Sequence, residues 1–281
     1  MWLVACSDIH AGSTVAVFPQ NAGIVTDDGQ PIEPSKLQIQ LHEWWLEGWG
    51  RLSKLIGGEP WQLALMGDLF EGHHHRSHQN VDPLGSPEFR ACHKLLRDPL
   101  SLHPEKIYMV RGTEAHVGQA GHKEETMARI LAAGDEDLAP QPIVPDPDIP
   151  TNKSAYWFRA EIEGHLIDLK HHGRFGGRAH TKDPYLRWYA HDIWESHVRN
   201  GDRPPSLAIR GHNHQYGDSG FNHEGLTRVV ACPCWQMQTS FIHRISIESL
   251  PSIGLVAFDI RESRIDVHPI LFKPERPTVC Q

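Results

Sequence analysis

The chain has 281 residues, 39% of them hydrophobic, and its 35 Asp and Glu residues outnumber its 27 Lys and Arg residues to give a formal net charge of −8. The hydrophobic content is enough for a sizeable core and excludes wholesale disorder, while the acidic balance argues against a broad electrostatic grip on nucleic acid and leaves only a local basic patch open. The 21 His residues beside so many carboxylates indicate binding of transition metals.

The cysteines and the N-terminus bear on the compartment. Five Cys residues form an odd, scattered set that is not a disulfide framework. The first ten residues lack a basic region, and their apolar run is too short for a signal peptide. No window reaches the roughly 18 apolar residues of a membrane helix. We therefore expect a soluble, cytoplasmic protein with no membrane partner, and reduced, mostly structural cysteines. These are Cys6, Cys92, Cys232, Cys234 and Cys280.

Strands and helices alternate in the first half of the chain. Short apolar runs that end at polar residues or Gly predict buried strands, and apolar positions at helical spacing predict helices. The predicted elements are strand 2–6, helix 36–58, strand 61–66, helix 86–98, strand 106–110 and helix 123–134. Irregular Gly, Pro, Asp and His content predicts loops over 11–35 and 72–85, near the expected site.

A proline-rich connector precedes the second half. Residues 139–150 hold five Pro, so they form neither a helix nor a central strand, and they join two halves of one domain over 1–281. Beyond it we expect a hairpin about Glu163-Gly164, helix 185–201 and strand 206–210, and then strand-like segments to the end.

Metal-binding residue types follow five of these predicted strands. Because ligand sites in α/β sheets form outside the carboxyl ends of strands, these side chains should converge at one edge. In strand order they are Asp8 and His10; Asp68; Thr113, Glu114 and His116; His171 and His172; and His212 and His214.

The spacing within these groups suits two cations. Asp8 and His10 alternate along an extended segment and point to the same side, as do His212 and His214. The carboxylate of Asp68 has two oxygens and can bridge two ions. A two-metal site about 3.5–4 Å wide suits in-line displacement at phosphorus.

In this arrangement the sequence resembles the calcineurin-like metallophosphoesterases. That family carries Asp-X-His, Gly-Asp, Gly-Asn-His followed by an acid, His before Gly, and Gly-His-X-His. Here four of the five blocks stand in the family's order, each after a predicted strand, over residues 8–214. They are Asp8-Ile9-His10, Gly67-Asp68, His172-Gly173 and Gly211-His212-Asn213-His214.

The resemblance implies a fold, a ligand set and an activity. The fold would be a four-layer α/β/β/α sandwich of two mixed β-sheets flanked by helices, and the β-rich last third would complete the second sheet. Two divalent transition-metal ions, which could be Mn, Fe, Zn or Ni, would support hydrolysis of phosphate esters by a metal-bridging hydroxide. One metal would be bound by Asp8, His10 and His214, the other by His172 and His212, and Asp68 would bind both.

The third block, Arg-Gly-Thr-Glu-Ala-His, departs from the family. Thr113 stands where the family has the ligand Asn, and Glu114 where it has the His that assists the leaving group. Glu114 is a good hard ligand and could replace the amide, and His116 could supply the lost proton donor. The block resembles a Gly-Thr-Glu variant of phage-encoded members.

Other residues near the predicted loops have both functional and structural interpretations. Arg174 could clamp a phosphate or be a solvated loop residue, and Glu114 could cap the following loop. Only one of His171 and His172 is expected to bind metal, with His171 in the core or behind the ligand. The triple His at 73–75 is expected at the rim of the site.

We therefore predict a metallophosphoesterase, with phosphodiesterase activity favoured over monoesterase activity and a small phosphate ester as substrate. A nuclease for single-stranded or terminal nucleic acid is the nearest alternative, and the net charge of −8 disfavours long duplex DNA. A binding module that has lost catalysis is the alternative of another class, supported only by the changed third block.

Overall fold

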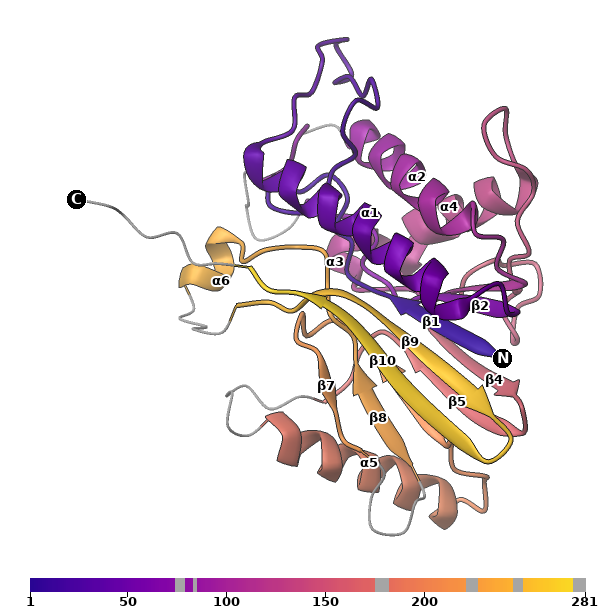
Figure 1. The fold of residues 1–281 in the computed structure, drawn as a ribbon. Helices are drawn as coiled ribbons and strands as arrows, with labels where there is room; N and C mark the ends of the chain where they lie inside the picture. The colour runs from indigo at the N-terminus through magenta and orange to yellow at the C-terminus, as the bar shows by residue number, and fades with distance from the viewer. Residues whose placement is uncertain (74–78, 83–84, 175–181, 221–226, 245–249, 275–281) are drawn as a thin grey trace.

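A computed structural model of the chain describes residues 1–73, 79–82, 85–174, 182–220, 227–244 and 250–274. These segments form two five-stranded sheets with helices on their outer faces (Figure 1). Cys280 and part of the triple His, residues 74–75, lie outside the described residues.

The first sheet has the strand order β10-β9-β1-β2-β3. β1, β2 and β3 run parallel, and β9 and β10 are antiparallel additions next to β1. All five residues of β1 and of β2 are buried, as the continuous apolar runs predict. The strands are β1 (Trp2–Cys6), β2 (Trp61–Leu65), β3 (Lys106–Met109), β9 (Ile253–Arg261) and β10 (Arg264–Phe272).

The second sheet has the order β4-β5-β6-β8-β7. β5, β6 and β8 run parallel, whereas β4 and β7 are antiparallel edge strands. The β4–β5 hairpin turns at Glu163 and Gly164, both with positive φ, and this confirms the predicted turn. The strands are β4 (Trp157–Ile162), β5 (His165–Lys170), β6 (Leu207–Arg210), β7 (Gly217–Asp218) and β8 (Arg228–Ala231).

Helices cover the outer face of each sheet (Figure 1). α1, α2 and α4 pack on the first sheet and enclose one hydrophobic cluster, a second cluster lies between the sheets, and a third lies between the second sheet and α5. The helices are α1 (Lys36–Ile56), α2 (Ser86–Leu100), α3 (Glu114–Val117), α4 (His122–Ala133), α5 (Lys182–Arg199) and α6 (Ser240–Arg244), with a 3-10 turn η1 (Gln119–Gly121). The predicted four-layer α/β/β/α fold is confirmed.

Local sequence signals explain where the long helix α1 begins and ends. The Ser35 side chain accepts a hydrogen bond from the Gln38 backbone, while the Gln38 side chain accepts one from the Ser35 backbone, and this forms a capping box. Gly57 ends the helix in the left-handed conformation, as expected for glycine. The predicted helix was therefore correct to within two residues.

Three sequence predictions differ from the structure. The last third does not all join the second sheet, because β9 and β10 pair with β1 and complete the first sheet. The proline-rich connector is not merely a surface link, since Ile143 within it forms a parallel bridge with Ile107 of β3. The short helices α3 and α6 were not predicted, because segments of four and five residues are too short to show a helical period.

The length and hydropathy of the described helices decide whether one of them could span a membrane. None of them is both long enough and apolar enough to cross a bilayer.

Candidate metal centre

Five strand ends meet at one edge, where the loops bearing the predicted ligands are tied together by backbone hydrogen bonds. The amide of Asp8 donates to the Gly67 carbonyl over 3.0 Å, and that of His10 donates to the Asp68 carbonyl over 3.0 Å. Within the second sheet, Gly211 N donates to the His171 carbonyl over 2.9 Å. These bonds hold the loops after β1 and β2, and those after β5 and β6, in fixed register.

The backbone of these loops is strained at the ligands themselves. Of the nine described non-glycine residues with a positive φ, five are predicted ligands. Left-handed conformations cost non-glycine residues about 1–2 kcal/mol each and persist only where the surroundings impose them. The five are Asp8 (φ 52°), His10 (φ 49°), Asp68 (φ 52°), His212 (φ 69°) and His214 (φ 53°). The conformational free energy that these five residues cost the folded state is therefore linked to the orientation of their side chains.

Asp8, His10 and His214 form the first ligand group, whose ligand atoms all lie within 4.8 Å of one another. His10 Nε2 lies 3.1 Å from His214 Nε2, and His214 Nε2 lies 3.3 Å from Asp8 Oδ1. Burial alone would raise the pKa of Asp8, but charge on His171 and His214 and a hydrogen bond from His214 outweigh it and lower that pKa. The group is thus an anionic oxygen facing two imidazole nitrogens.

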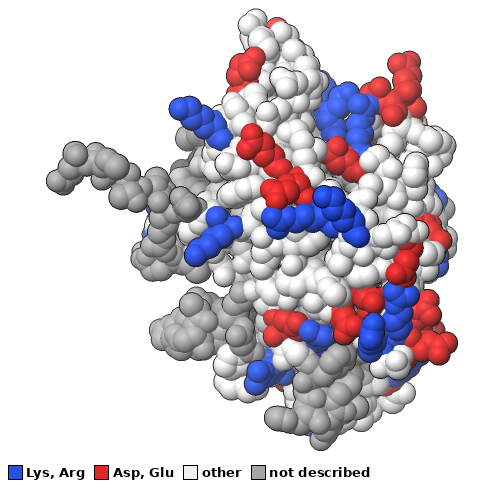
Figure 2. All heavy atoms as spheres, in the orientation of Figure 1, with Lys and Arg blue, Asp and Glu red and all other residues white. Residues whose placement is uncertain are grey.

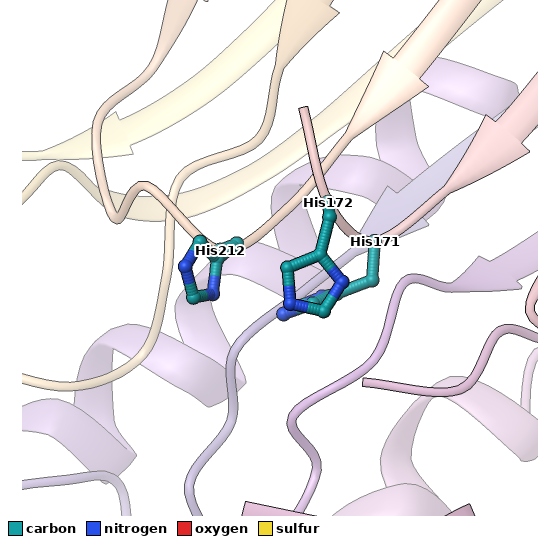
Figure 3. Close-up of side chains that lie close together, drawn as sticks. All are labelled: His171, His172 and His212. Atoms are coloured by element: carbon teal, nitrogen blue, oxygen red, sulfur yellow. The ribbon is translucent and has the colours of Figure 1, made fainter. Parts of the chain in front are cut away.

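His171, His172 and His212 form the second ligand group (Figure 3). His171 and His172 follow β5, and His212 follows β6 from the neighbouring loop. Burial and the charges of its two His neighbours lower the pKa of His172 to about 4, so this imidazole is neutral at pH 7.

Asp68 lies between the two groups. A carboxylate oxygen of Asp68 lies within 4.8 Å of ligand atoms of His10 and His116, and also of ligand atoms of Asp8 and His171. Its Oδ1 accepts a hydrogen bond from Thr113 N over 2.6 Å, and its Oδ2 lies 2.9 Å from His171 Nε2. Burial would raise the pKa of Asp68, but the charge and hydrogen bond of His171 lower it well below its usual value. This is the position from which a carboxylate can bridge two cations.

The hydrogen bonds of His171 leave a position between this ring and Asp68 that suits a proton or a cation. His171 Nδ1 lies 2.7 Å from the Met66 carbonyl, which can only accept, so Nδ1 carries the proton. In a neutral ring the Nε2 lone pair would then face Asp68 Oδ2 at 2.9 Å, and a proton or a cation must lie between them. Burial lowers the pKa of His171, yet the Asp68 charge raises it to about 9, so a proton occupies this position in the metal-free protein.

Glycine makes room for this crowding at two positions. A Cβ on Gly112 would overlap the carboxylate and backbone nitrogen of Asp68, and a Cβ on Gly211 would overlap Ser7 Oγ and crowd Asp8 Oδ2. Any side chain at either position would displace a ligand carboxylate.

Two buried glutamates contact the predicted ligands or the loops that carry them. Glu71 Oε2 lies 3.1 Å from His10 Nδ1 and accepts a hydrogen bond from Gln236 Nε2 over 2.6 Å. Glu124 of α4 accepts hydrogen bonds from Leu69 N over 3.2 Å and from Gly112 N over 2.6 Å, so it joins the loop after β2 to the loop after β3. Burial and the Asp68 charge raise the pKa of Glu124 to about 8.

The remaining predicted site residues fall in different places. His116 lies at ligand distance from His10 and Asp68, and its Nδ1 donates to the Glu71 carbonyl over 2.7 Å. Glu114 is exposed and accepts a hydrogen bond from Ala120 N over 3.2 Å, outside the ligand groups. Arg174 is 74% exposed, with its guanidinium 3.8 Å from Asp192. The structure thus brings His116 into the cluster and leaves Glu114 and Arg174 outside it.

The structure differs from the sequence-based prediction in the weight that it gives to two kinds of residue. The prediction was one ligand from the pair His171 and His172, with His172 favoured, and the structure places His171 in two of the candidate ligand groups. The prediction also gave no role to Glu71 or Glu124, which follow no motif and reach the site only through the packing of their segments. The one available signal concerned Glu71, an acid three residues after the predicted ligand Asp68.

The described thiols are buried, and one of them, Cys234, donates from Sγ to the backbone carbonyl of His214 over 4.0 Å. Cys6, Cys92, Cys232 and Cys234 are free and buried. Burial raises the pKa of Cys6, Cys92 and Cys232 above the usual value for a thiol, which makes these side chains unreactive packing groups.

The fold is similar to several solved structures. One is wild-type Vps29 of Entamoeba histolytica complexed with Zn²⁺, at 11% identity and a TM-score of 0.42, covering 97% of this chain and 100% of that chain. Another is an archaeal phosphodiesterase, at 10% identity and a TM-score of 0.41, covering 96% and 100%. A third is a predicted phosphoesterase of Streptococcus pneumoniae TIGR4, at 11% identity and a TM-score of 0.38, covering 96% and 88%.

At this level of identity and TM-score, these likenesses do not bear on what this chain binds or does. No protein-family model matches the chain, and no curated protein matches it.

Proposed function

We propose that this chain is a calcineurin-like metallophosphoesterase that hydrolyses small phosphate diesters at a centre for two divalent metal ions. The observation that supports this best is the convergence of strained loops from five strand ends on two adjacent ligand groups, with Asp68 between them. Neither group needs a residue from outside the described chain.

The residues divide between the two sites by their contacts. Asp8, His10 and His214 would hold one ion, His212 with His171 or His172 would hold the other, and Asp68 would contact both. Two divalent ions bound here would supply positive charge for the phosphate oxygens and would acidify water for attack at phosphorus.

His116 is suited to give a proton to the leaving oxygen. Its Nδ1–H is held by the Glu71 carbonyl, so a protonated ring presents Nε2–H from beside His10 and Asp68. The carbonyl also fixes the ring orientation, which a proton donor needs. Glu114 is less suited, since its carboxylate is engaged with Ala120 N.

The surface favours a small substrate over long nucleic acid. On the face shown in Figure 2, Lys and Arg side chains are interleaved with Asp and Glu, and the whole chain has a formal net charge of −8. A polyanion gains little from such a surface, because phosphate contacts need clustered cations. Phosphodiesterase activity on small molecules is therefore proposed ahead of nuclease activity.

A binding module without catalysis is disfavoured by the completeness of the ligand groups. Thr113 is the one family ligand position that is changed, and its Oγ1 still lies 3.1 Å from Asp68 Oδ2. A chain that had lost its chemistry would have no reason to keep five strained ligand positions.

Turnover of bis(p-nitrophenyl) phosphate with added Mn²⁺ tests the proposal. Asp68→Ala is the control, since it removes the carboxylate between the two groups, and labelled single-stranded DNA compares the nuclease alternative. Wild-type protein is expected to cleave the small diester at least a hundredfold faster than the variant, roughly the loss seen when a charge-stabilising catalytic group is removed. Equal rates for the two proteins would contradict the proposal.

A further inference from the structure

We infer that the second metal site is a three-histidine site, bound by His171, His172 and His212 together, which selects a zinc-like cation over manganese. This inference rests on the proposed function in that it refines the same centre. It differs from the ligand set expected from the sequence, in which only one of the two consecutive histidines binds.

The first support is the direction of the two consecutive rings. Neighbouring residues of a strand point to opposite faces, so His171 and His172 would diverge if β5 continued through them. The strand ends at Lys170 and the chain bends at His171. As a result both side chains point into the same cluster, beside His212 (Figure 3).

The second support is how the rings meet. The ring centroids are 4.8 Å apart for His171 and His172, 4.7 Å for His172 and His212, and 5.3 Å for His171 and His212. The interplanar angles of 90°, 48° and 74° show that no pair is stacked face to face. One nitrogen from each ring lies within 4.8 Å of the others. Imidazole nitrogens on one tetrahedral Zn²⁺ at 2.0–2.1 Å are about 3.3–3.4 Å apart, so the three rings would draw closer together on binding the ion.

The third support is Thr113, which occupies the position where the calcineurin-like family has a ligand Asn. Its Oγ1 lies 3.1 Å from His172 Nε2 and 3.2 Å from His212 Nδ1. A neutral hydroxyl binds a cation weakly, so a site that relied on Thr113 would lack one good ligand. His172 presents its nitrogen to the same small volume and supplies that ligand.

The ligand chemistry then separates the two sites. The first group offers two imidazoles and the carboxylates of Asp8 and Asp68. The second offers three imidazoles beside Asp68, and Asp8 comes within ligand distance of its member His171. Imidazole ligands favour Zn²⁺, Fe²⁺ and Ni²⁺, and oxygen ligands suit Mn²⁺. The second site should therefore fill with Zn²⁺ first, and the first site should tolerate Mn²⁺.

Competition dialysis against a chromogenic chelator tests this without any substrate, with Zn²⁺ and Mn²⁺ measured separately. His172→Gln is expected to weaken the tighter Zn²⁺ site by about tenfold or more and to change Mn²⁺ binding much less. His103→Gln is the matched control, because His103 is exposed and follows α2, away from both ligand groups. An unchanged Zn²⁺ affinity in folded His172→Gln protein would overturn the inference.

X-ray absorption at the zinc edge, with one equivalent of Zn²⁺, gives a second readout that does not depend on comparing affinities. Three imidazole ligands are expected in the wild type and two in His172→Gln; two or fewer in the wild type would contradict the three-histidine site. Diester turnover on the same samples keeps the claims separate. Three imidazoles without turnover would count against the proposed function alone, and turnover without the His172 effect would count against this inference alone.

Discussion

Glu71 shows how a residue outside the sequence motifs can contact a candidate metal site. Its carboxylate is buried beside His10 Nδ1 at 3.1 Å, and its backbone carbonyl accepts from His116 Nδ1. One residue thus places a carboxylate beside a predicted ligand and holds the ring of the proposed proton donor by a hydrogen bond. Carboxylates in this position fix the tautomer of a ligating imidazole and raise its basicity.

Replacing Glu71 by Gln should weaken metal binding. The amide has no negative charge to place 3.1 Å from the His10 ring, and we expect about a 10- to 100-fold loss of affinity at one site. Competition dialysis measures this, with circular dichroism to establish folding. Glu88→Gln is the matched control, because Glu88 is also buried but bonds Gly72 N and Lys123 rather than a histidine. Equal affinities in wild type and Glu71→Gln would show that Glu71 does not orient His10.

At the scale of elements, the site depends on loops that turn sharply as soon as each strand ends. Val110 forms a parallel bridge with Ala155, and only two residues later Gly112 packs directly against Asp68. Such contacts transmit any change in the loop after β3 to the loop after β2.

Gly112→Ala should therefore impair both stability and metal binding. Its Cβ would overlap Asp68, and overpacking of this kind costs about 1–3 kcal/mol. Gly50→Ala is the control, since Gly50 is exposed on α1 with no atom near its Cβ position, and alanine there should stabilise by up to about 1 kcal/mol. Urea unfolding with metal analysis measures both effects. Two variants that shift stability in the same direction would contradict the packing argument.

The contact between α1 and α2 contains a carboxylate that burial disfavours. Trp45 Nε1 of α1 donates to Asp98 Oδ2 of α2 over 2.8 Å. Burial raises the pKa of Asp98, more than the Trp45 hydrogen bond and the charge of His42 lower it. Because the folded-state pKa exceeds the unfolded one, the folded state keeps a proton that the unfolded state has lost. Protonation of Asp98 therefore stabilises the folded protein at low pH. This contribution to the free energy of unfolding is lost as the pH rises from about 4 through the raised pKa.

Asp98→Asn should remove this pH dependence, because the Asn oxygen still accepts the Trp45 hydrogen bond and carries no charge. The free energy of unfolding should fall less between pH 4.5 and pH 7.5 in the variant than in the wild type. Urea titrations at the two pH values measure the difference. Parallel pH profiles, or a variant less stable than the wild type at pH 7.5, would contradict the explanation.

At the scale of the whole molecule, the sequence predicted what depends on local pattern. Buried runs such as Trp2–Cys6 predicted the strands, and the polar residues after them predicted which side chains lie together at one edge. Two facts depended on packing over long distances. Nothing local tells β9 to pair with β1 rather than with the second sheet. The bend that turns His171 and His172 to one side is fixed by contacts with Met66 and Asp68, more than 100 residues away in the sequence.

Metal removal should lower the stability of the entire fold, because the ligand loops join both sheets. A ligand at 100 times its dissociation constant stabilises by about 2.7 kcal/mol, which for a chain of this size corresponds to roughly 5–10 °C in melting temperature. Melting with and without a chelator measures this shift. Asp68→Ala should show a smaller shift, and an equal shift in the two proteins would place the bound metal elsewhere.

The most direct test of a two-metal phosphoesterase centre is a titration of diester turnover against equivalents of Mn²⁺ bound to the metal-free protein. Turnover of bis(p-nitrophenyl) phosphate is expected to stay low at one bound equivalent and to rise as the second binds, with none at any Mn²⁺ concentration in Asp68→Ala. Full turnover with one bound equivalent, or none with two, would contradict the proposed centre.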